Sequence, residues 1–321
     1  VWTVELEAMN SHWVGDRVAT VDVAQLAEMC KTPRTELLRR MNADLGWGPN
    51  QFFRYPKELR GAGFTWRAVA GRQPQHWFKF KHDVVSVQPR RKQASKQSVV
   101  AAKVCTERDT GCAENGESEV VVAYDYLLST MPITLLGKMT GIAADMRLAH
   151  SKVALVGIGL KKPQSPFYST VNWAYYPAPD LVFYRCTFIS NFNNVMTPNS
   201  DEFWSVVVEI GMRPEEPVDR DSLIQRTIDG LLSRRVFTDR SQIVDRWFQL
   251  LPYGYPIPTL CRDAELSRAH AAFEPHQIYS RGRFGGWKYE VANQDHSFTQ
   301  GYEWVDHVLF GTPETVYKAY A

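Results

Sequence analysis

The chain has 321 residues, of which 44% are hydrophobic and 22% are charged, and its net charge is +2. This length allows one large domain or two ordinary ones, and the composition is typical of a globular protein with a sizeable core. The near balance of charge argues against nucleic acid or an acidic membrane surface as a partner. The five cysteines are scattered and odd in number, which indicates reduced thiols and a cytoplasmic location. No apolar run reaches membrane-spanning length, and we expect neither a signal peptide nor a membrane association.

The first part of the chain predicts helices separated by breaks that contain glycine and proline. Asp22 suits the N-cap of a helix over residues 22–30, and a proline suits the first turn of a second helix over residues 33–45. The sequence Gly-Trp-Gly-Pro-Asn at 46–50 ends this second helix. A further helix is predicted over residues 64–70.

The pattern then changes to β-strands. Residues 84–87, 99–104 and 119–128 are rich in valine and alternate apolar with polar side chains, which predicts three strands. The polar stretches 90–96 and 107–117 lie between them. We interpret both as solvated hairpin tips or insertions, because the basic run is short and carries no interleaved aromatic residues.

The middle of the chain predicts an antiparallel sheet with a flanking helix. Short turn-like connections join four predicted strands, at 152–160, 170–176, 181–189 and 205–210. A helix is predicted over residues 222–232, where leucine and isoleucine form one face and an aspartate lies near the start. Another strand is predicted over residues 243–251.

These elements give the fold class α+β, with an antiparallel sheet, flanking helices and an interleaved order along the chain. We divide the sequence into four regions. They are a helical region at 1–50, a helix with a β-hairpin insert at 51–145, the antiparallel sheet at 146–270, and a C-terminal loop and helix at 271–321.

Three common kinds of catalytic motif are absent from the sequence. The pairs Gly157-Ile-Gly159 and Gly61-Ala-Gly63 lack the third glycine or the preceding strand of a dinucleotide-binding turn. The eight histidines are dispersed without metal-ligand spacing, and there is no serine nucleophile elbow. An enzyme without these motifs would leave the difficult chemistry to a cofactor.

The segment 281–297 is the most informative part of the sequence. Two arginines and three glycines precede a tryptophan, a tyrosine and a polar cluster that opens a helix. Glycines allow a planar ligand to approach the backbone, and the polar cluster lies beside the unpaired N–H groups of the helix start. The cluster consists of Asn293, Gln294, Asp295 and Ser297.

The helix after this segment carries an apolar stripe at helical spacing, which we expect to anchor it. The stripe consists of Phe298, Tyr302, Val305 and Leu309. The segment would then combine a ligand platform with the element that holds the platform in place.

Four further clusters pair aromatic rings with a guanidinium, an amide or a phenol. They are Trp2 with Arg17, residues 47–50, residues 173–185 and residues 253–259. Taken singly, each is explained by core packing or a surface ion pair. Arg185 is the stronger candidate, because an unpaired charge on an apolar strand is costly. Tyr255 lies between a glycine and a proline, which suggests a rigid turn that aims its phenol.

In this order, the clusters closely resemble the eukaryotic branch of UDP-galactopyranose mutase, and the resemblance spans nearly the whole chain. The segment 280–298 gives the longest and most specific match. The other matching pieces are Val1-Trp2, 13–17, 46–50, 53–56, 183–185 and 254–259.

The resemblance implies a FAD-binding flavoprotein fold and an isomerase that interconverts UDP-galactopyranose and UDP-galactofuranose. It implies covalent catalysis through N5 of reduced FAD, with NADPH or NADH as the reductant and a UDP-galactose nucleotide sugar as the partner. The four regions then correspond to a substrate-binding region, part of the FAD domain, the substrate domain and a FAD-contacting C-terminus.

The resemblance also implies roles for single residues. Arg17 and Arg185 are similar to the diphosphate clamps of the family, and the phenols around the diphosphate would be Tyr175, Tyr255 and Tyr289. Trp2 and Asn50 would be walls of the nucleotide-sugar pocket. The implied flavin contacts are Val84, Arg283, Asn293, Gln294 and Ser297, with Val84 acting through its backbone near the adenine. Neither the resemblance nor the residues themselves provide a protein general base.

The sequence departs from the family at two positions and at its start. Ala292 stands where the family has glycine beside the flavin, which would crowd the ring system, and Phe192 stands where tyrosine is common. The glycine-rich FAD turn of the family, its histidine loop and part of its uridine pocket would all precede Val1. We therefore expect an N-terminally truncated chain, without its Rossmann part, that binds FAD weakly or not at all and is inactive alone.

Two alternatives remain open. A flavin oxidase of the amine-oxidase or protoporphyrinogen-oxidase type shares the overall fold, but its pocket would be more apolar and would often place a lysine near the flavin. The second alternative is that the chain as given is a non-catalytic fragment. Two arginine clamps and a tyrosine-rich pocket favour a diphosphate substrate over an amine.

Overall fold

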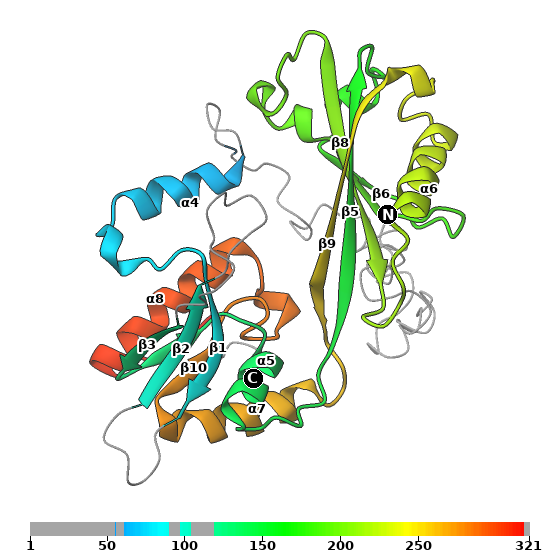
Figure 1. The fold of residues 1–321 in the computed structure, drawn as a ribbon. Coiled ribbons are helices and arrows are strands. Elements are labelled where there is room, and N and C mark those ends of the chain that lie inside the picture. Colours follow the sequence, from blue (N-terminus) through cyan, green and yellow to red (C-terminus); the bar gives the residue numbers. More distant parts are fainter. Residues whose placement is uncertain (1–54, 56–60, 90–96, 104–118, 318–321) are drawn as a thin grey trace, which may run out of the picture. The chain divides into compact units, whose positions relative to one another are not determined.

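The computed structural model describes residues 55, 61–89, 97–103 and 119–317 (Figure 1). The chain divides into two compact units. Unit 1 comprises Val1–Gln73 and His150–Gly254, and unit 2 comprises Pro74–Ala149 and Tyr255–Ala321. The predictions for residues 22–30, 33–45, 90–96 and 107–117 lie outside the described residues.

Unit 1 is built on a five-stranded sheet in the order β6-β7-β8-β5-β9. Its strands are β5 (Ala149–Lys161), β6 (Trp173–Tyr175), β7 (Arg185–Thr187), β8 (Phe203–Met212) and β9 (Ile243–Ile257). The pairings of β6 with β7, β7 with β8 and β8 with β5 are all antiparallel, which confirms the predicted antiparallel sheet. β6 and β7 are shorter than predicted and β9 is longer.

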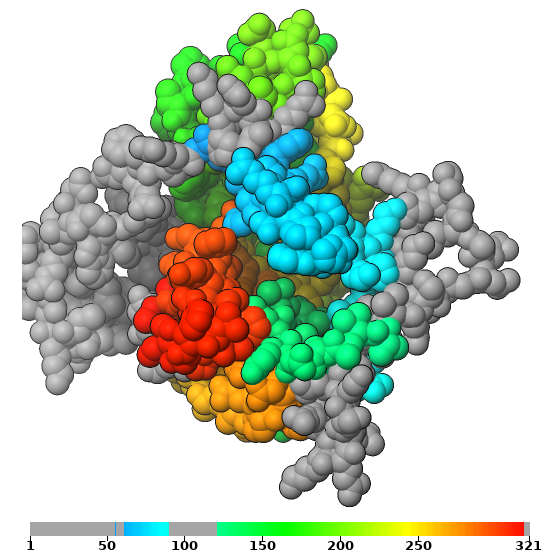
Figure 2. Space-filling model, turned by 90° about the vertical axis from the view of Figure 1, so that its left-hand side faces the viewer, coloured from blue at the N-terminus to red at the C-terminus, as the bar shows by residue number. Residues whose placement is uncertain are grey.

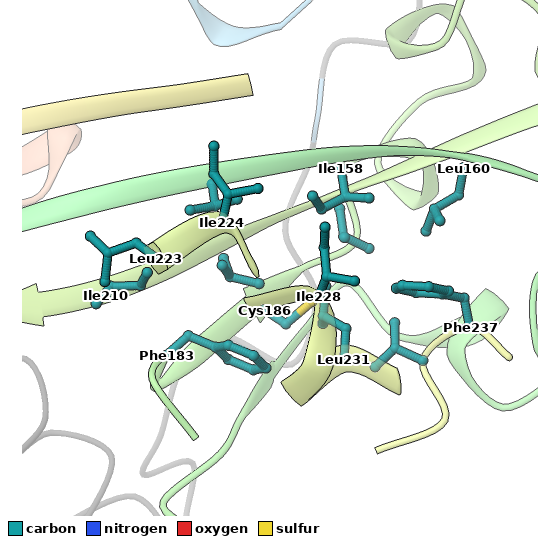
Figure 3. Packing of buried hydrophobic residues seen from close by; sticks show 14 of the residues in the cluster. Ile158, Leu160, Phe183, Cys186, Ile210, Leu223, Ile224, Ile228, Leu231 and Phe237 are labelled. Carbon is teal, nitrogen blue, oxygen red and sulfur yellow. The ribbon is translucent and has the colours of Figure 1, made fainter. Parts of the chain in front are cut away.

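One face of this sheet packs against α6 (Arg220–Ser233), the helix predicted over residues 222–232. Asp219 caps α6, because its carboxylate accepts the N–H of Ser222 at 3.0 Å. Along β8, half-buried and buried side chains alternate strictly. The core between sheet and helix includes Ile158, Phe183, Cys186, Ile210, Leu223, Ile224, Ile228 and Leu231 (Figure 3). The side chains of β7 and β8 that do not enter this core therefore lie on the opposite face of the sheet.

Unit 2 contains two small sheets. The first is antiparallel in the order β1-β2-β3, with β1 (His82–Gln88), β2 (Gln97–Lys103) and β3 (Glu119–Tyr124). The second is a parallel pair of β4 (Leu127–Ser129) and β10 (Ile278–Ser280). Our prediction of one strand over 119–128 is wrong, because the chain bends at Asp125 and Tyr126 and enters the second sheet.

Besides α6, the helices predicted over 64–70 and after the polar cluster at 293–297 are confirmed, and two other helices were not predicted. α4 (Ala62–Gly71) of unit 1 confirms the helix predicted over 64–70. Unit 2 contains α5 (Ile133–Thr140), α7 (Arg262–Phe273) and α8 (Gln294–Phe310), of which α5 and α7 were not predicted. Short 3-10 segments occur at Gln75–Trp77, Tyr168–Thr170, Ile189–Asn191, Asn194–Met196, Arg240–Gln242, Glu274–His276 and Tyr289–Val291. None of the helices in the described part of the chain has the length and apolarity needed to cross a membrane.

The apolar stripe of α8 is exposed instead of buried. The side chains of the stripe are exposed by 61% at Phe298, 63% at Tyr302, 43% at Val305 and 65% at Leu309. α8 lies at the surface of unit 2, in red in Figure 2. Our prediction that this stripe anchors the helix is therefore wrong. A different face of α8, which carries the buried Gln300, makes the contacts that hold it.

Candidate functional site

A row of three polar side chains crosses the sheet of unit 1. In the strand register, Tyr175 of β6 lies opposite Arg185 of β7, and Arg185 lies opposite Glu209 of β8. Successive side chains along a strand point to opposite faces. Because the neighbouring Cys186 and Val208 belong to the core beneath α6, the row lies on the other face.

Arg185 is held tightly within this row. Its Nε donates to Oε1 of Glu209 at 2.8 Å, its Nη2 donates to the same oxygen, and its Nη1 donates to the Tyr175 hydroxyl at 3.3 Å. The hydroxyl of Tyr184 donates to the other Glu209 oxygen at 2.5 Å. The side chain of Arg185 is 25% exposed and that of Glu209 is 13% exposed. The guanidinium is therefore fixed in orientation but remains partly accessible.

The pairing with Glu209 corrects one sequence argument. We singled out Arg185 because an unpaired charge on an apolar strand is costly, but its charge is neutralised by Glu209. Glu209 was not among the residues predicted from the sequence. The available signal was that Glu209 is the one charged residue in β8, a mostly apolar strand. Pairing it with Arg185 would have required the register between strands.

Aromatic side chains lie in the same unit. The ring of Phe192 stacks on Trp173, with 6.3 Å between centroids, and meets the edge of Tyr55 at 5.3 Å. Phe192 is the position where the resembling family commonly has tyrosine. The Phe192 ring makes both aromatic contacts without a hydroxyl.

Unit 2 brings together three of the residues that the sequence analysis singled out. The guanidinium of Arg283 lies 5.3 Å from the centroid of the Tyr255 ring, within the range of a cation–π contact. The rings of Tyr255 and Tyr289 are 5.8 Å apart and tilted by 55°. One cation and two phenols therefore form a compact cluster.

Our prediction that Tyr255 lies in a turn is wrong. It lies within β9, and so do the prolines on either side of it, Pro252 and Pro256. Proline is tolerated in edge strands, and β9 is at the edge of its sheet. The phenol is therefore aimed by strand geometry.

The loop at 281–291, which carries Arg283 and Tyr289, needs its glycines for its own backbone. A Cβ at Gly285 would lie 2.1 Å from the carbonyl oxygen of Arg281, and one at Gly286 would lie 2.9 Å from that of Gly282. Gly282 has a φ of +86°, which side chains disfavour. The loop backbone alone therefore accounts for these glycines. The expectation that they allow a planar ligand to approach stays a prediction.

Gln300 of α8 joins the two ends of this loop. Its side-chain oxygen accepts the N–H of Gly282 at 2.8 Å, and its side-chain nitrogen donates to the carbonyl of Val291 at 2.8 Å. Gln300 is 1% exposed. A single buried amide thus ties both ends of the loop to the helix.

The polar start of α8 is accessible. Asn293 is the N-cap, yet its side chain makes no capping hydrogen bond, and Asn293 and Gln294 are both exposed. Ser297 is half-buried, and its N–H donates to the carbonyl of Asn293 at 2.9 Å. The polar groups that the sequence analysis named here are therefore within reach of a ligand.

Ala292 fits its position without strain. Its φ is −113°, an ordinary value for a residue with a side chain, and it is only 5% exposed. The backbone therefore does not require the glycine of the resembling family at this position.

Next to Tyr289, an ion pair between the buried Arg262 and the partly exposed Glu290 secures the end of the loop. Arg262 donates to both oxygens of Glu290, at 2.7 and 2.6 Å. Burial alone would raise the pKa of Glu290, but the hydrogen bonds from Arg262 outweigh it and hold the pKa below its ordinary value. Glu290 therefore stays charged as the partner of Arg262.

The remaining candidates are placed as follows. Val84 is half-buried in β1, where the register with β2 shifts between Val84 and Ser86. Such a bulge leaves part of a strand backbone unpaired in its ladder. Trp2, Arg17 and Asn50 lie outside the described residues, so their roles stay predictions.

No protein-family model matches the sequence. Among solved structures, the chain is similar to a reduced UDP-galactopyranose mutase, with a TM-score of 0.74 and 32% identity over 95% of this chain. The chain spans 61% of the length of that mutase. A protein described as a protoporphyrinogen oxidase from Exiguobacterium sp. aligns with a TM-score of 0.43 and 15% identity, over 62% of this chain and 40% of that one. The chain thus shares the fold of the corresponding part of the mutase.

Proposed function

We propose that this chain belongs to a FAD-dependent UDP-galactopyranose mutase and takes part in the interconversion of UDP-galactopyranose and UDP-galactofuranose. The observation that carries the proposal is the similarity to a solved mutase, at 32% identity and a TM-score of 0.74 over 95% of the chain. Because the chain spans 61% of that mutase, we further propose that it acts as part of a longer protein.

Arg185 is proposed as a ligand of the substrate diphosphate. The planar fork of a guanidinium matches the geometry of phosphate oxygens. Glu209 orients this fork, and the phenol of Tyr175 accepts from Nη1, which places a second polar group beside the guanidinium. Since the ion pair carries little net charge, we expect Arg185 to act by directed hydrogen bonds more than by long-range attraction. Arg17, Trp2 and Asn50 remain the proposed partners outside the described residues.

The residues of unit 2 fit a flavin. The α8 start offers exposed polar groups and an N-cap side chain that makes no capping bond, which suits the polar edge of a flavin ring. Arg283, stacked on Tyr255, suits an anionic or electron-rich part of the same cofactor. We propose Arg283, Asn293, Gln294, Ser297 and the backbone at Val84 as the residues that hold FAD, with Tyr255 and Tyr289 on the diphosphate. The reduced cofactor, when bound, supplies the nucleophile for the anomeric carbon of the sugar.

The protein residues would contribute binding and charge stabilisation. When UDP departs from the sugar, negative charge develops on the diphosphate, and N–H and O–H donors already aimed at it lower the barrier. Arg185 and Tyr175 can provide such donors without reorganising, because their mutual contact already exists. No acid–base residue of the chain is required by this proposal.

The test uses the protein expressed from its complete reading frame, reduced with dithionite or with NADPH or NADH. We expect it to bind FAD and to convert UDP-galactofuranose to UDP-galactopyranose, as followed by chromatography. Arg185→Met should remove most of this activity and weaken UDP binding. Arg234→Met is the matched control, because Arg234 pairs with the exposed Asp180 in the same unit. A bound, reduced flavin without interconversion would refute the proposed function, and Arg185→Met with full UDP affinity would refute the assignment of Arg185.

A further inference from the structure

The residues that follow α8 contact the 281–291 loop through a buried ion pair. The guanidinium of Arg281 donates to both oxygens of Glu314, each at 2.6 Å. The two side chains are 5% and 1% exposed. Arg281, one of the two arginines in the segment singled out from the sequence, is therefore committed to a structural partner, whereas Arg283 lies over Tyr255.

Tyr317 adds a second set of contacts to the same loop. Its hydroxyl donates to the carbonyl of Gly286 at 3.2 Å, and its own carbonyl accepts from Nζ of Lys288 at 2.9 Å. The charged groups of Arg281 and Lys288 lie 4.5 and 4.7 Å from the centroid of its ring. Burial raises the pKa of Tyr317, so its phenol keeps the proton that it donates.

The same segment is fastened to two helices. The carboxylate of Glu303 on α8 accepts the N–H groups of Thr315 and Val316, both at 2.9 Å. The Nε2 atom of His270 on α7 lies 2.6 Å from the Tyr317 hydroxyl. The segment therefore connects the loop to α7 and α8 within unit 2.

We propose that residues 314–317, the C-terminal clasp, hold the 281–291 loop in its ligand-binding shape, with Glu314 and Tyr317 as positioning residues. In the chain, Arg283 lies between two residues that the clasp contacts, Arg281 and Gly286. Tyr289 follows directly after a third, Lys288. The clasp therefore restricts the orientation of both side chains. The identity of the ligand as FAD rests on the proposed function.

The physical reason is the cost of an unpaired charge. Without Glu314, the guanidinium of Arg281 would be left buried without its counter-ion, which is strongly unfavourable. The loop would relieve this cost by moving so that Arg281 reaches water. Such a movement would displace Arg283, two residues further along, from the ring of Tyr255.

The first test measures amide hydrogen exchange of the ligand-free chain by mass spectrometry. In Glu314→Gln, we expect peptides that cover 281–291 to exchange roughly tenfold faster, because local opening becomes easier. Asp145→Asn is the control, since it removes an exposed ion pair with Arg268 in the same unit, and we expect no change there. Tyr317→Phe keeps the ring but loses the hydroxyl, and we expect an increase smaller than in Tyr317→Leu.

The second test measures FAD affinity in the complete protein. Glu314→Gln should weaken FAD binding roughly tenfold and alter the absorbance spectrum of the bound flavin, whereas Asp145→Asn should do neither. If the wild-type protein binds no FAD, the proposed function fails, and the exchange experiment still decides the clasp. If Glu314→Gln does not fold, Tyr317→Phe against Tyr317→Leu provides the same comparison. Unchanged exchange of residues 281–291 in the folded variants would overturn the proposal.

Discussion

The pairing of Arg185 with Glu209 leads to a quantitative prediction for Glu209→Gln. Removing one partner of a fully buried ion pair costs roughly 3–5 kcal/mol, whereas an exposed pair contributes about 1 kcal/mol or less. The side chains here are 25% and 13% exposed, so the pair lies between these limits. Glutamine keeps the shape and one acceptor oxygen. We therefore expect Glu209→Gln to lower the free energy of unfolding by about 2 kcal/mol.

The measurement is a double-mutant cycle by urea denaturation of the wild type, Glu209→Gln, Arg185→Met and the double variant. Arg185→Met should also cost about 2 kcal/mol, because it leaves the Glu209 carboxylate without its partner. The double variant removes both charges and should cost little more than either single change, which gives a coupling energy of about 2 kcal/mol. If the two single effects simply add, to within about 0.5 kcal/mol, the pair does not hold Arg185 in place and our reasoning is wrong.

Three further predictions concern unit 2 and the core of unit 1. Gly285→Ala should lower the free energy of unfolding of the ligand-free protein by about 1–3 kcal/mol. The added Cβ would lie 2.1 Å from the carbonyl oxygen of Arg281 in the same loop. An unchanged melting temperature would contradict this prediction. Hydrogen bonds from Arg268 and Arg147 lower the pKa of Glu265 from 4.5 to about 2. The difference in unfolding free energy between wild type and Glu265→Gln should therefore be largest above about pH 4.5 and should disappear as the pH falls towards 2. A difference that grows on acidification would show that the lowered pKa of Glu265 does not stabilise the fold. Leu231→Ala, at a fully buried position, should cost about 2–5 kcal/mol in the same denaturation assay, whereas a cost below about 1 kcal/mol would contradict the packing against the sheet.

The sequence predicted correctly those elements in which the apolar residues are also the buried ones. The leucine and isoleucine face of α6 is buried against the sheet, and the aspartate at its start is its N-cap. The strands predicted at 152–160 and 205–210 are likewise β5 and β8, and they pair in the predicted antiparallel sense. In these elements local preference and tertiary packing agree.

α8 shows where the same reasoning failed. Its apolar stripe has helical spacing, but the spacing does not say what covers the stripe, and within the described structure the stripe is exposed. Within the described structure, the buried residue of α8 is the polar Gln300. A single buried amide carries no periodic signal, so its role could not be predicted from the sequence.

The candidate site was predictable in part. Tyr255, Tyr289 and Arg283 were named from the sequence and lie together in unit 2, and Tyr175 and Arg185 lie together in unit 1. Glu209 and Glu314, which neutralise arginines, could not be found, because each pair joins residues far apart in the chain. Such pairings depend on strand register and loop path, which single-sequence patterns do not specify.

The parallel pairing of β4 with β10 has a consequence for biosynthesis. β4 lies at Leu127–Ser129 and β10 at Ile278–Ser280, so the first strand leaves the ribosome long before its partner exists. Contacts between such distant segments form slowly, and a nascent chain that awaits them is open to aggregation. Until residues 278–280 have been synthesised, the side chains of Leu127 and Leu128 cannot be covered by their partner strand.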